Sequence, residues 1–421
     1  MSTLEPAAEP PASAVTPPEE EGGGGGPPSV AATLALYERA GGIITPILTA
    51  FVAFLVGGIV VAVTGHNPLR TYQAIFNGTG LNWLFPWVSG QARSDAALNL
   101  QQTLLITTPL ILTGLAVAFA FRCGLFNIGG QGQYIVGAIT GVWVGSSFLG
   151  MPGVLHIVLA IVVATLAGAA WAGIAGFLKA TVGAHEVIST IMLNWIAYWI
   201  GSYAFGLRGP LQSSTQTSVP ISNDIADNAH LHVFWGDPIL QGLHIGFFIA
   251  LAALVVFWVT IARTTLGYEV RAVGFNPEAA RYGGISVARN YFLAMAISGA
   301  FAGLAGVIDI LGWQFRLNVN DIQASTIGFI GIAVALLGRN TAVGVFFSAL
   351  LFGSLVSGTS TRHLDPSIFR PDLANNLTLL IQGLIVLFVG ADVLILYLWQ
   401  ARRKVVPRRA PRPAARPTQA A

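Results

Sequence analysis

The chain is poor in charge and in lysine and contains one cysteine. Only 9% of its 421 residues are charged, whereas soluble domains average about 25%. The two lysines, Lys179 and Lys404, are not followed by Ser or Thr, so the chain lacks the Gly-Lys-Ser/Thr loop that cradles ATP phosphates. The single Cys123 excludes an intrachain disulfide and a cysteine-cluster metal site. These absences exclude a transporter that hydrolyses ATP itself.

Catalytic constellations are missing as well. The pair His185-Glu186 leads to Ser189 instead of a second histidine, so the zinc-binding pattern His-Glu-x-x-His is incomplete. The nucleophile pattern Gly-x-Ser-x-Gly does not occur. We therefore expect a protein that performs no covalent chemistry and carries no cofactor of its own.

Long apolar segments are what the chain has in abundance. About 20 apolar residues in a helix cross the hydrocarbon core of a bilayer, and hydropathy predicts ten such spans. They are residues 43–63, 100–121, 126–147, 155–178, 186–207, 244–262, 291–311, 324–338, 341–357 and 375–398. The sequence predicts an all-α polytopic membrane protein with about ten transmembrane helices. Segments 126–147 and 324–338 are rich in glycine or short, as discontinuous transporter helices are, so one or both can be re-entrant.

The basic residues predict the orientation. Seven of them follow the last span, namely Arg402, Arg403, Lys404, Arg408, Arg409, Arg412 and Arg416. With this tail in the cytoplasm, fifteen of the 21 Lys and Arg residues lie on the cytoplasmic side, as the positive-inside rule requires. An even number of spans then places both termini in the cytoplasm. Such a cluster beside a span is more typical of contact with anionic lipid than of nucleic-acid binding, so we expect no nucleic-acid partner.

Composition divides the chain into three parts. Residues 1–40 form a Pro-, Gly- and Glu-rich tail that we expect to be disordered and cytoplasmic, because it buries too little apolar surface to fold. Residues 41–398 form the transmembrane domain, and residues 399–421 form the basic cytoplasmic tail. No removable signal peptide is expected, since no cationic segment followed by a short apolar stretch opens the chain.

The longest polar break on the predicted cytoplasmic side covers residues 262–290. Within it, Asn276 suits a helix N-cap, Pro277 suits the first helical position and Glu278 suits the positive end of the helix dipole. Ala279, Ala280 and Arg281 continue this short helix, and Gly283 or Gly284 ends it. The helix can be a docking element for a soluble partner or a solvated loop helix, and the residues alone leave both interpretations open.

Four segments carry a resemblance to a known family. They are GLFNIGGQGQYIVGA from Gly124, HEVISTIMLNWIA from His185, GYEVRAVGFNPEAARYGGI from Gly267 and GIAVALLGRN from Gly331. In combination and order they resemble the permease subunits of the bacterial ATP-binding-cassette (ABC) importer family for branched-chain amino acids, ribose and nucleosides. The resemblance covers residues from about 100 to 395 and is strongest to the nucleoside permeases served by a basic-membrane-protein lipoprotein.

The resemblance implies a type II-like importer permease in the bacterial cytoplasmic membrane. It implies an ABC ATPase that binds ATP and Mg and docks on residues Asn276 to Arg281. It also implies a second, related permease subunit and an extracellular lipid-anchored substrate-binding protein. Nucleosides are the expected cargo, and a ribose-type sugar or another small polar solute is the alternative. An ion-coupled secondary transporter is the rival from another class, disfavoured because acids are sparse in the spans.

Polar residues within the spans are candidates for the substrate path, because buried polar groups in a bilayer usually face a cavity or one another. We assign the path to Asn127, Gln131, Gln133, Ser189 and Asn194. Hydrogen bonding between helices is the alternative for these side chains. Glu186, at the cytoplasmic start of its span, is assigned to a gate or a docking contact. Relatives often carry an acid at the position of Gln131 and a polar residue near Ile330, which weakens the assignment of the cargo.

The remaining signals concern packing and the membrane interface. Gly137, Gly141 and Gly145, and Gly299 with Gly303, are spaced for close helix contacts. A weak internal repeat relates residues 114–122 to residues 331–339. Asp309 and Asp392 lie near predicted span ends and are interpreted as interfacial. The tryptophans fit aromatic belts, and none is assigned to cargo stacking: Trp83, Trp87, Trp195, Trp199 and Trp313.

Overall fold

The computed structural model describes residues 30–148, 150–237, 242–359 and 371–390. The predictions for the first 29 residues, for Asp392 and for the basic C-terminal tail lie outside these ranges. The chain divides into a unit of residues 1–43 and a unit of residues 44–421. In the first unit, the described residues 30–43 are helical and belong to α1, Val30–Val63. This helix begins before the tail boundary predicted at residue 40, because its first turns are rich in Ala and Leu, which have high helix propensity.

In the second unit the described residues are mostly helical. α2 (Pro68–Thr79) and α3 (Gly90–Arg122) are followed by α4 (Gly130–Ser147), α5 (Gly153–Val182), α6 (Glu186–Phe205), α7 (Gly246–Arg263), α8 (Thr265–Phe275) and α9 (Pro277–Tyr282). Then come α10 (Val287–Asp309), a π-helical segment (Ile310–Gln314), α11 (Val319–Ala324), α12 (Ile327–Leu337), α13 (Ala342–Gly358) and α14 (Pro371–Gly390). Two short strands, β1 (Val233–Trp235) and β2 (Leu243–His244), pair antiparallel with Val233 opposite His244. Each of the ten predicted spans overlaps a helix, and the last of them, 375–398, is described only as far as residue 390.

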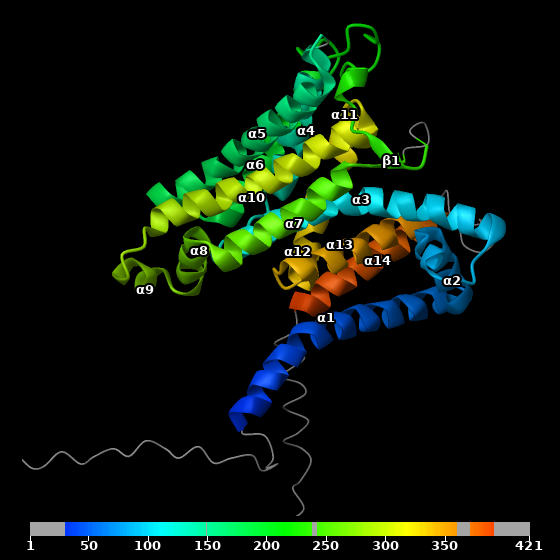
Figure 1. Ribbon diagram of the computed structural model, residues 1–421, viewed down its shortest axis with the longest axis horizontal. Helices are drawn as coiled ribbons and strands as arrows, with labels where there is room; N and C mark the ends of the chain where they lie inside the picture. Colours follow the sequence, from blue (N-terminus) through cyan, green and yellow to red (C-terminus); the bar gives the residue numbers. More distant parts are fainter. Residues whose placement is uncertain (1–29, 149, 238–241, 360–370, 391–421) are drawn as a thin grey trace, which may run out of the picture. The chain divides into compact units, whose positions relative to one another are not determined.

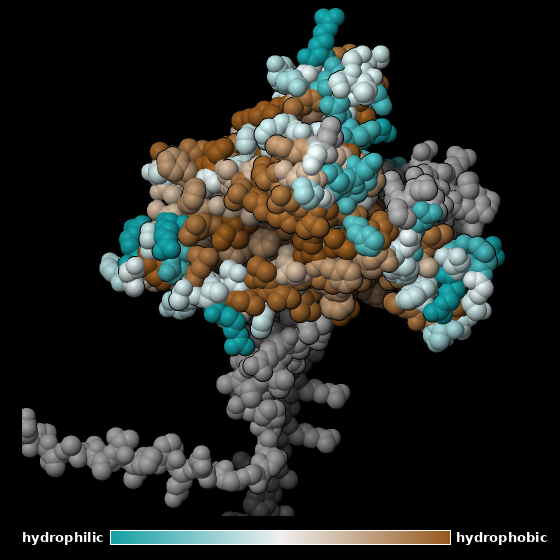
Figure 2. Space-filling view, turned by 45° about the horizontal axis from the view of Figure 1, so that its top comes forward, coloured by the Kyte–Doolittle hydropathy of each residue, from teal (hydrophilic) through white to brown (hydrophobic). Residues whose placement is uncertain are grey.

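Within the described residues, five segments are long and apolar enough to cross a membrane: Gly90–Arg122, Gly153–Val182, Gly246–Arg263, Val287–Gln314 and Val319–Leu337. Shorter apolar helices cover Thr49–Val63, Ala342–Gly358 and Asn376–Phe388. The chain is therefore a polytopic helical membrane protein, as predicted, while the number of crossings stays a prediction. On the face seen in Figure 2, hydrophobic surface covers the middle and hydrophilic residues gather towards its margins.

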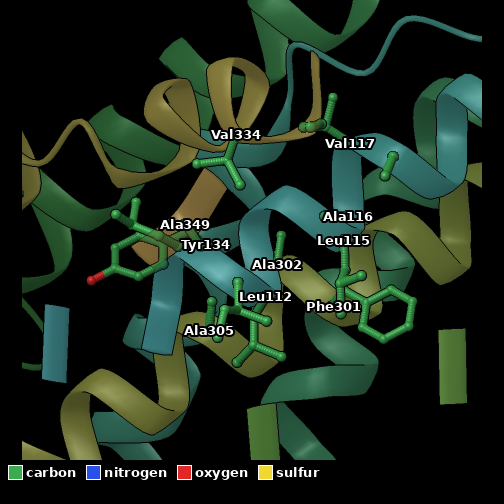
Figure 3. Packing of buried hydrophobic residues seen from close by; sticks show 14 of the residues in the cluster. Leu112, Leu115, Ala116, Val117, Tyr134, Phe301, Ala302, Ala305, Val334 and Ala349 are labelled. Carbon is green, nitrogen blue, oxygen red and sulfur yellow. The ribbon is translucent and has the colours of Figure 1, made fainter. Parts of the chain in front are cut away.

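Glycines bring the central helices together. In Figure 1, α4, α5 and α10 lie side by side. A Cβ added to Gly137 on α4 would lie 2.3 Å from the carbonyl oxygen of Gly303 on α10, and one added to Gly299 would lie 2.2 Å from the carbonyl oxygen of Gly168 on α5. The prediction that Gly137, Gly299 and Gly303 mark close helix packing is confirmed. Figure 3 shows the apolar core beside this contact, where Leu112 of α3 lies near Ala302 and Ala305 of α10.

The two segments of the weak internal repeat are neighbours in space. Helix α3 packs on α12 where Gly114 meets Val334 and Gly331 meets Thr113. Just past the end of α3, the fully buried Cys123 lies with its Sγ 3.7 Å from the carbonyl oxygen of Asn290. The Arg122 guanidinium donates from Nε and Nη2 to the carbonyl oxygen of Asn340, at 2.9 and 2.7 Å, which ties the last residue of the first repeat to the residue that follows the second.

Candidate functional site

A broken helix organises the candidate substrate site. The predicted span 324–338 forms α12, which is only 11 residues long and so rises about 16 Å, half the hydrocarbon thickness. The short helix α11 precedes it, and the chain turns at Ser325 and Thr326 between the two. An Asn318 capping box with Asp321 fixes the start of α11. The discontinuity was predicted from the short apolar run; whether the segment is re-entrant stays a prediction.

Gln131 holds this break in place. Its Oε1 accepts a hydrogen bond from the backbone N–H of Gly328 at 2.8 Å, and its Nε2 donates to the carbonyl oxygen of Ser325 at 3.0 Å. The side chain therefore satisfies one of the free N–H groups at the start of α12 and one carbonyl at the end of α11. A carboxylate at this position would accept from Gly328 but could not donate to Ser325.

Asn127 and Gln133 bond to each other in the interior. The Asn127 amide nitrogen donates to Gln133 Oε1 at 2.9 Å and to Ser298 Oγ of α10 at 2.7 Å, while Asn127 Oδ1 accepts from the N–H of Gly129. Ser298 in turn donates to the carbonyl oxygen of Ala116 on α3. This network links the glycine-rich start of α4 to α10 and α3.

Asn194 makes a similar link from α6. It accepts from the N–H of Gly132 at 2.7 Å and donates to the carbonyl oxygen of Ile128 at 2.9 Å. Ser189 bonds only to its own helix, to the carbonyl oxygen of His185 at 3.2 Å. Asn127, Gln131, Gln133 and Asn194 are thus buried and engaged with protein groups, and none of the five assigned residues lines the cavity described next. Their part in the substrate path stays a prediction.

A cavity of about 830 Å³ opens beside the break between α11 and α12. This volume lies within the range of small-molecule sites, about 300–1,000 Å³. Residues from α3, α4, the π-helical segment and α11 to α14 line it. Its polar and aromatic lining consists of Tyr134, Trp313, Gln314, Arg316, Asn318, Asp321, Ser325, Thr326, Thr359, Thr378 and Gln382.

The charged residues of the lining are both engaged with neighbouring protein groups. Arg316 lies 3.9 Å from the carboxylate of Asp224, and Asp321 accepts from the backbone of Asn318. Neutral amides and hydroxyls outnumber these two charged groups in the lining, which suits a polar ligand.

Asp309 shapes one wall of the cavity. The residue is 1% exposed and is the last residue of α10, directly before the π-helical segment, so its carboxylate lies inside the protein. Its position at the membrane interface stays a prediction. Asp309 Oδ2 accepts from the Tyr134 hydroxyl at 2.6 Å and Oδ1 accepts from the Trp313 indole N–H at 3.1 Å. Both donors line the cavity, and in Figure 3 the Tyr134 hydroxyl points away from the apolar core.

The polar break 262–290 forms the predicted short helix. Asn276 Oδ1 caps α9 by accepting from the N–H groups of Glu278 and Ala279, Pro277 occupies the first helical position, and the helix ends at Gly283. This local prediction is confirmed. In Figure 1, α9 lies beyond one end of α10 and α11 lies beyond the other end. The coupling-loop candidate and α11, one of the elements that line the cavity, therefore lie beyond opposite ends of α10.

Two almost fully exposed aromatic side chains lie at the two ends of α9, Phe275 shortly before its start and Tyr282 as its last residue. Phe275 is 95% exposed and Tyr282 is 94% exposed. Between them, Glu278 and Arg281 form an exposed ion pair at 3.4 Å, and Ala280 packs inward. A pair of exposed aromatics beside charged residues is the composition of a protein-binding patch.

Glu186, assigned to a gate or docking contact, forms an ion pair with Lys179 at 2.8 Å. The pair joins the end of α5 to the start of α6 and is only partly exposed. Because the two residues lie on either side of the α5–α6 turn, their ion pair helps to hold this turn. The gating role stays a prediction.

Helical spans, a broken helix beside a cavity and an exposed loop helix define a membrane permease. Residues 99–390 match the family described as "Branched-chain amino acid transport system / permease component". This match covers more than half of the chain, and the protein belongs to this family.

Curated relatives agree with the family. The Guanosine ABC transporter permease protein NupP of Bacillus subtilis is 36% identical over 88% of this chain and 99% of its own. The Nucleoside ABC transporter permease protein NupB of Lactococcus lactis is 34% identical over 84% of this chain and 92% of its own. The Glucose ABC transporter permease protein TsgB13 of Haloferax volcanii is 36% identical over 82% of this chain and 86% of its own. No solved structure matches the chain. The resemblance stated from four sequence segments is thereby confirmed.

Proposed function

We propose that this protein is the permease subunit of an ATP-driven importer and that its cargo is a nucleoside. The observation that carries the proposal is the similarity to NupP and NupB over nearly the full length of both relatives. The cavity supports it, because its volume of about 830 Å³ suits a small ligand and its lining combines aromatic rings with amides and hydroxyls. The chain acts as a transport component, and hydrolysis of ATP with Mg belongs to a partner ATPase.

The helix α9 is the proposed contact with that ATPase. Phe275 and Tyr282 are almost fully exposed, and burying them against a groove would release water from two large apolar surfaces. In this scheme, ATP binding draws the coupling helices together and changes which side of the cavity is open. Such a change is a population shift, driven by tighter binding of ATP to one state of the assembly.

Two further partners complete the proposed importer. A second related permease would share the central path, and a lipid-anchored binding protein would deliver cargo at the α11 side. This arrangement requires α9 in the cytoplasm, which agrees with the distribution of basic residues and places both termini in the cytoplasm. The proposed location is a bacterial cytoplasmic membrane.

A sugar is the second candidate cargo. The relative TsgB13, named for glucose, is as similar in identity as NupP, and amides and hydroxyls in the cavity can also bind a polyol. The two candidates differ in one testable property, because a nucleoside transporter distinguishes its cargo from the free pentose.

The deciding experiment is uptake in cells that lack the gene and in cells where it is restored. Radiolabelled adenosine, guanosine, uridine, ribose and glucose are supplied, each with an excess of unlabelled competitor. We expect nucleoside uptake that depends on the gene and that nucleosides, but not ribose, compete. Unchanged nucleoside uptake together with lost sugar uptake would refute the nucleoside assignment and retain the importer.

A further inference from the structure

The Asp309 carboxylate holds two aromatic side chains against the cavity. It lies 1% exposed at the end of α10, and no Lys or Arg of the described ranges forms an ion pair with it. Its two oxygens are instead occupied by the Tyr134 hydroxyl and the Trp313 indole. A buried acid in a membrane segment is costly and usually marks a functional site, and here its hydrogen bonds orient two rings of one cavity wall.

The backbone around Trp313 is fixed in an uncommon conformation. Residues Ile310–Gln314 form a π-helix, a feature frequent at functional sites. It ends at Phe315, whose φ of 59° is left-handed; that ring stacks on His230 at 4.1 Å. A side chain at Gly312 would collide with the His244 ring, at 2.1 Å from Nε2. These contacts hold the segment that carries Trp313 and Gln314 before any ligand arrives.

Three polar groups of the same cavity have no protein partner. They are Gln314 Oε1, Ser325 Oγ and Gln382 Nε2. Gln382 is 8% exposed, so its amide is largely shielded from bulk solvent. Native structures leave few buried polar groups unpaired, and each exception needs a reason. A ligand in the cavity that bonded to these three polar groups would explain why all three lack a protein partner.

Together these groups offer what a nucleobase requires. Tryptophan and tyrosine rings stack on bases, and glutamine amides pair with the donor and acceptor edges of bases. The unpaired set contains an amide acceptor, an amide donor and a hydroxyl that can do both. A base offers these rings a flat π face, whereas a pentose offers them only the C–H groups of a smaller, puckered ring.

We propose that Trp313, Tyr134, Gln314, Ser325 and Gln382 form the subsite that receives the base of the cargo, with Asp309 as the residue that positions the two rings. This inference rests on the proposed nucleoside function and goes beyond it by naming the residues that read the base. Gln314 and Gln382 set which base is preferred, whereas Trp313 binds every base through its face. Asp309 contacts no cargo and acts through Tyr134 and Trp313.

The test measures nucleoside uptake kinetics and competition for the wild-type protein and single variants, each normalised to the amount of protein in the membrane. Trp313→Leu removes the stacking face and is expected to raise KM for all nucleosides by about tenfold, within the range observed when stacked aromatic residues are lost. Trp313→Phe retains a ring and is expected to stay within about threefold of the wild type. Gln314→Leu and Gln382→Leu are expected to change the order in which adenosine, guanosine and uridine compete.

Asp309→Asn replaces an acceptor by a donor that faces another donor, so the rings lose their fixed orientation. We expect KM to rise for all nucleosides with the maximal rate nearly unchanged, and Tyr134→Phe, which removes one of the two hydrogen bonds, to give a smaller rise in the same direction. If Asp309→Asn is absent from the membrane, Tyr134→Phe and Trp313→Phe still test the hydrogen bonds singly. Trp199→Leu, an exposed tryptophan of α6, and Gln323→Leu, an exposed glutamine of α11, are matched controls outside the cavity.

The outcomes separate this inference from the proposed function. Wild-type protein that imports nucleosides, with variants that keep wild-type KM and competition order, would overturn the base subsite and leave the function intact. Wild-type protein that imports only sugars would overturn both. Elevated KM in Trp313→Leu and a changed base order in the glutamine variants, with unchanged controls, would support the subsite.

Discussion

The aromatic pair that flanks α9 allows a quantitative test of ATPase docking. Phe275→Ala and Tyr282→Ala remove side chains that are 95% and 94% exposed, so neither change should destabilise the permease itself. Aromatic side chains bury about 150–250 Å² each, worth at most about 4–6 kcal/mol at 25 cal/mol per Å². Entropy costs and incomplete desolvation reduce this to about 2 kcal/mol for a typical interface anchor. Each substitution should therefore weaken ATPase binding about 30-fold.

The assay uses permease in nanodiscs and titrates the purified partner ATPase, with ATPase activity and co-purification as readouts. Tyr203→Ala is the matched control, because Tyr203 is 74% exposed and lies near the end of α6 remote from its cytoplasmic start in the predicted orientation. The double variant Glu278→Arg with Arg281→Glu is a second test of docking. Its helix keeps an ion pair, but the partner ATPase meets the two charges in exchanged positions. Wild-type affinity in both aromatic variants and in the charge swap would refute docking on α9.

Two further predictions concern packing and pH. Gly137→Ala places a methyl group 2.3 Å from the Gly303 carbonyl oxygen, so the melting temperature in detergent should fall by several degrees, corresponding to about 1–3 kcal/mol of overpacking. The control is Gly150→Ala, which meets no atom within 4 Å and should leave the melting temperature unchanged. Equal melting temperatures of the two variants would contradict the packing of α4 on α10. Burial lowers the pKa of His230 from its ordinary value of 6.5, so the folded protein favours the neutral ring and loses stability as pH falls below about 6.5 through the lower folded-state pKa. His230→Phe keeps an aromatic ring on Phe315 and should reduce the drop in melting temperature between pH 7.5 and pH 5; an identical drop would show that another group titrates.

Local signals in the sequence were sufficient for several parts of the structure. The Asn276-Pro277 pair predicted the start of α9 because an N-cap bonds to backbone groups only two and three residues further on. Glycines at four-residue spacing predicted the contact between Gly137 and Gly303, since small residues on one helical face allow backbones to approach. The short apolar run before Arg339 likewise predicted a discontinuous helix.

The cavity wall could not be predicted in the same way. Tyr134 and Asp309 are 175 positions apart in the chain, and only the packing of α4 on α10 brings them together. The π-helical turn that carries Trp313 departs from the period of 3.6 on which helix patterns rest. From the sequence, Trp313 was therefore interpreted as a residue of an aromatic belt and Asp309 as an interfacial residue. A signal was nevertheless present, because an acid four residues before a tryptophan can bond to it across one helical turn.

The solitary cysteine makes the protein a ready background for chemical labelling. Cys123 is fully buried beside Asn290, and burial raises the pKa of its thiol to about 12. Maleimides react with the thiolate form of cysteine, so this buried residue should not react with them in the folded state. A new cysteine in place of Tyr282 or Thr326 would then carry the only reactive label, and spectroscopic distances from the loop helix or the cavity mouth could follow the transport cycle without first removing native thiols.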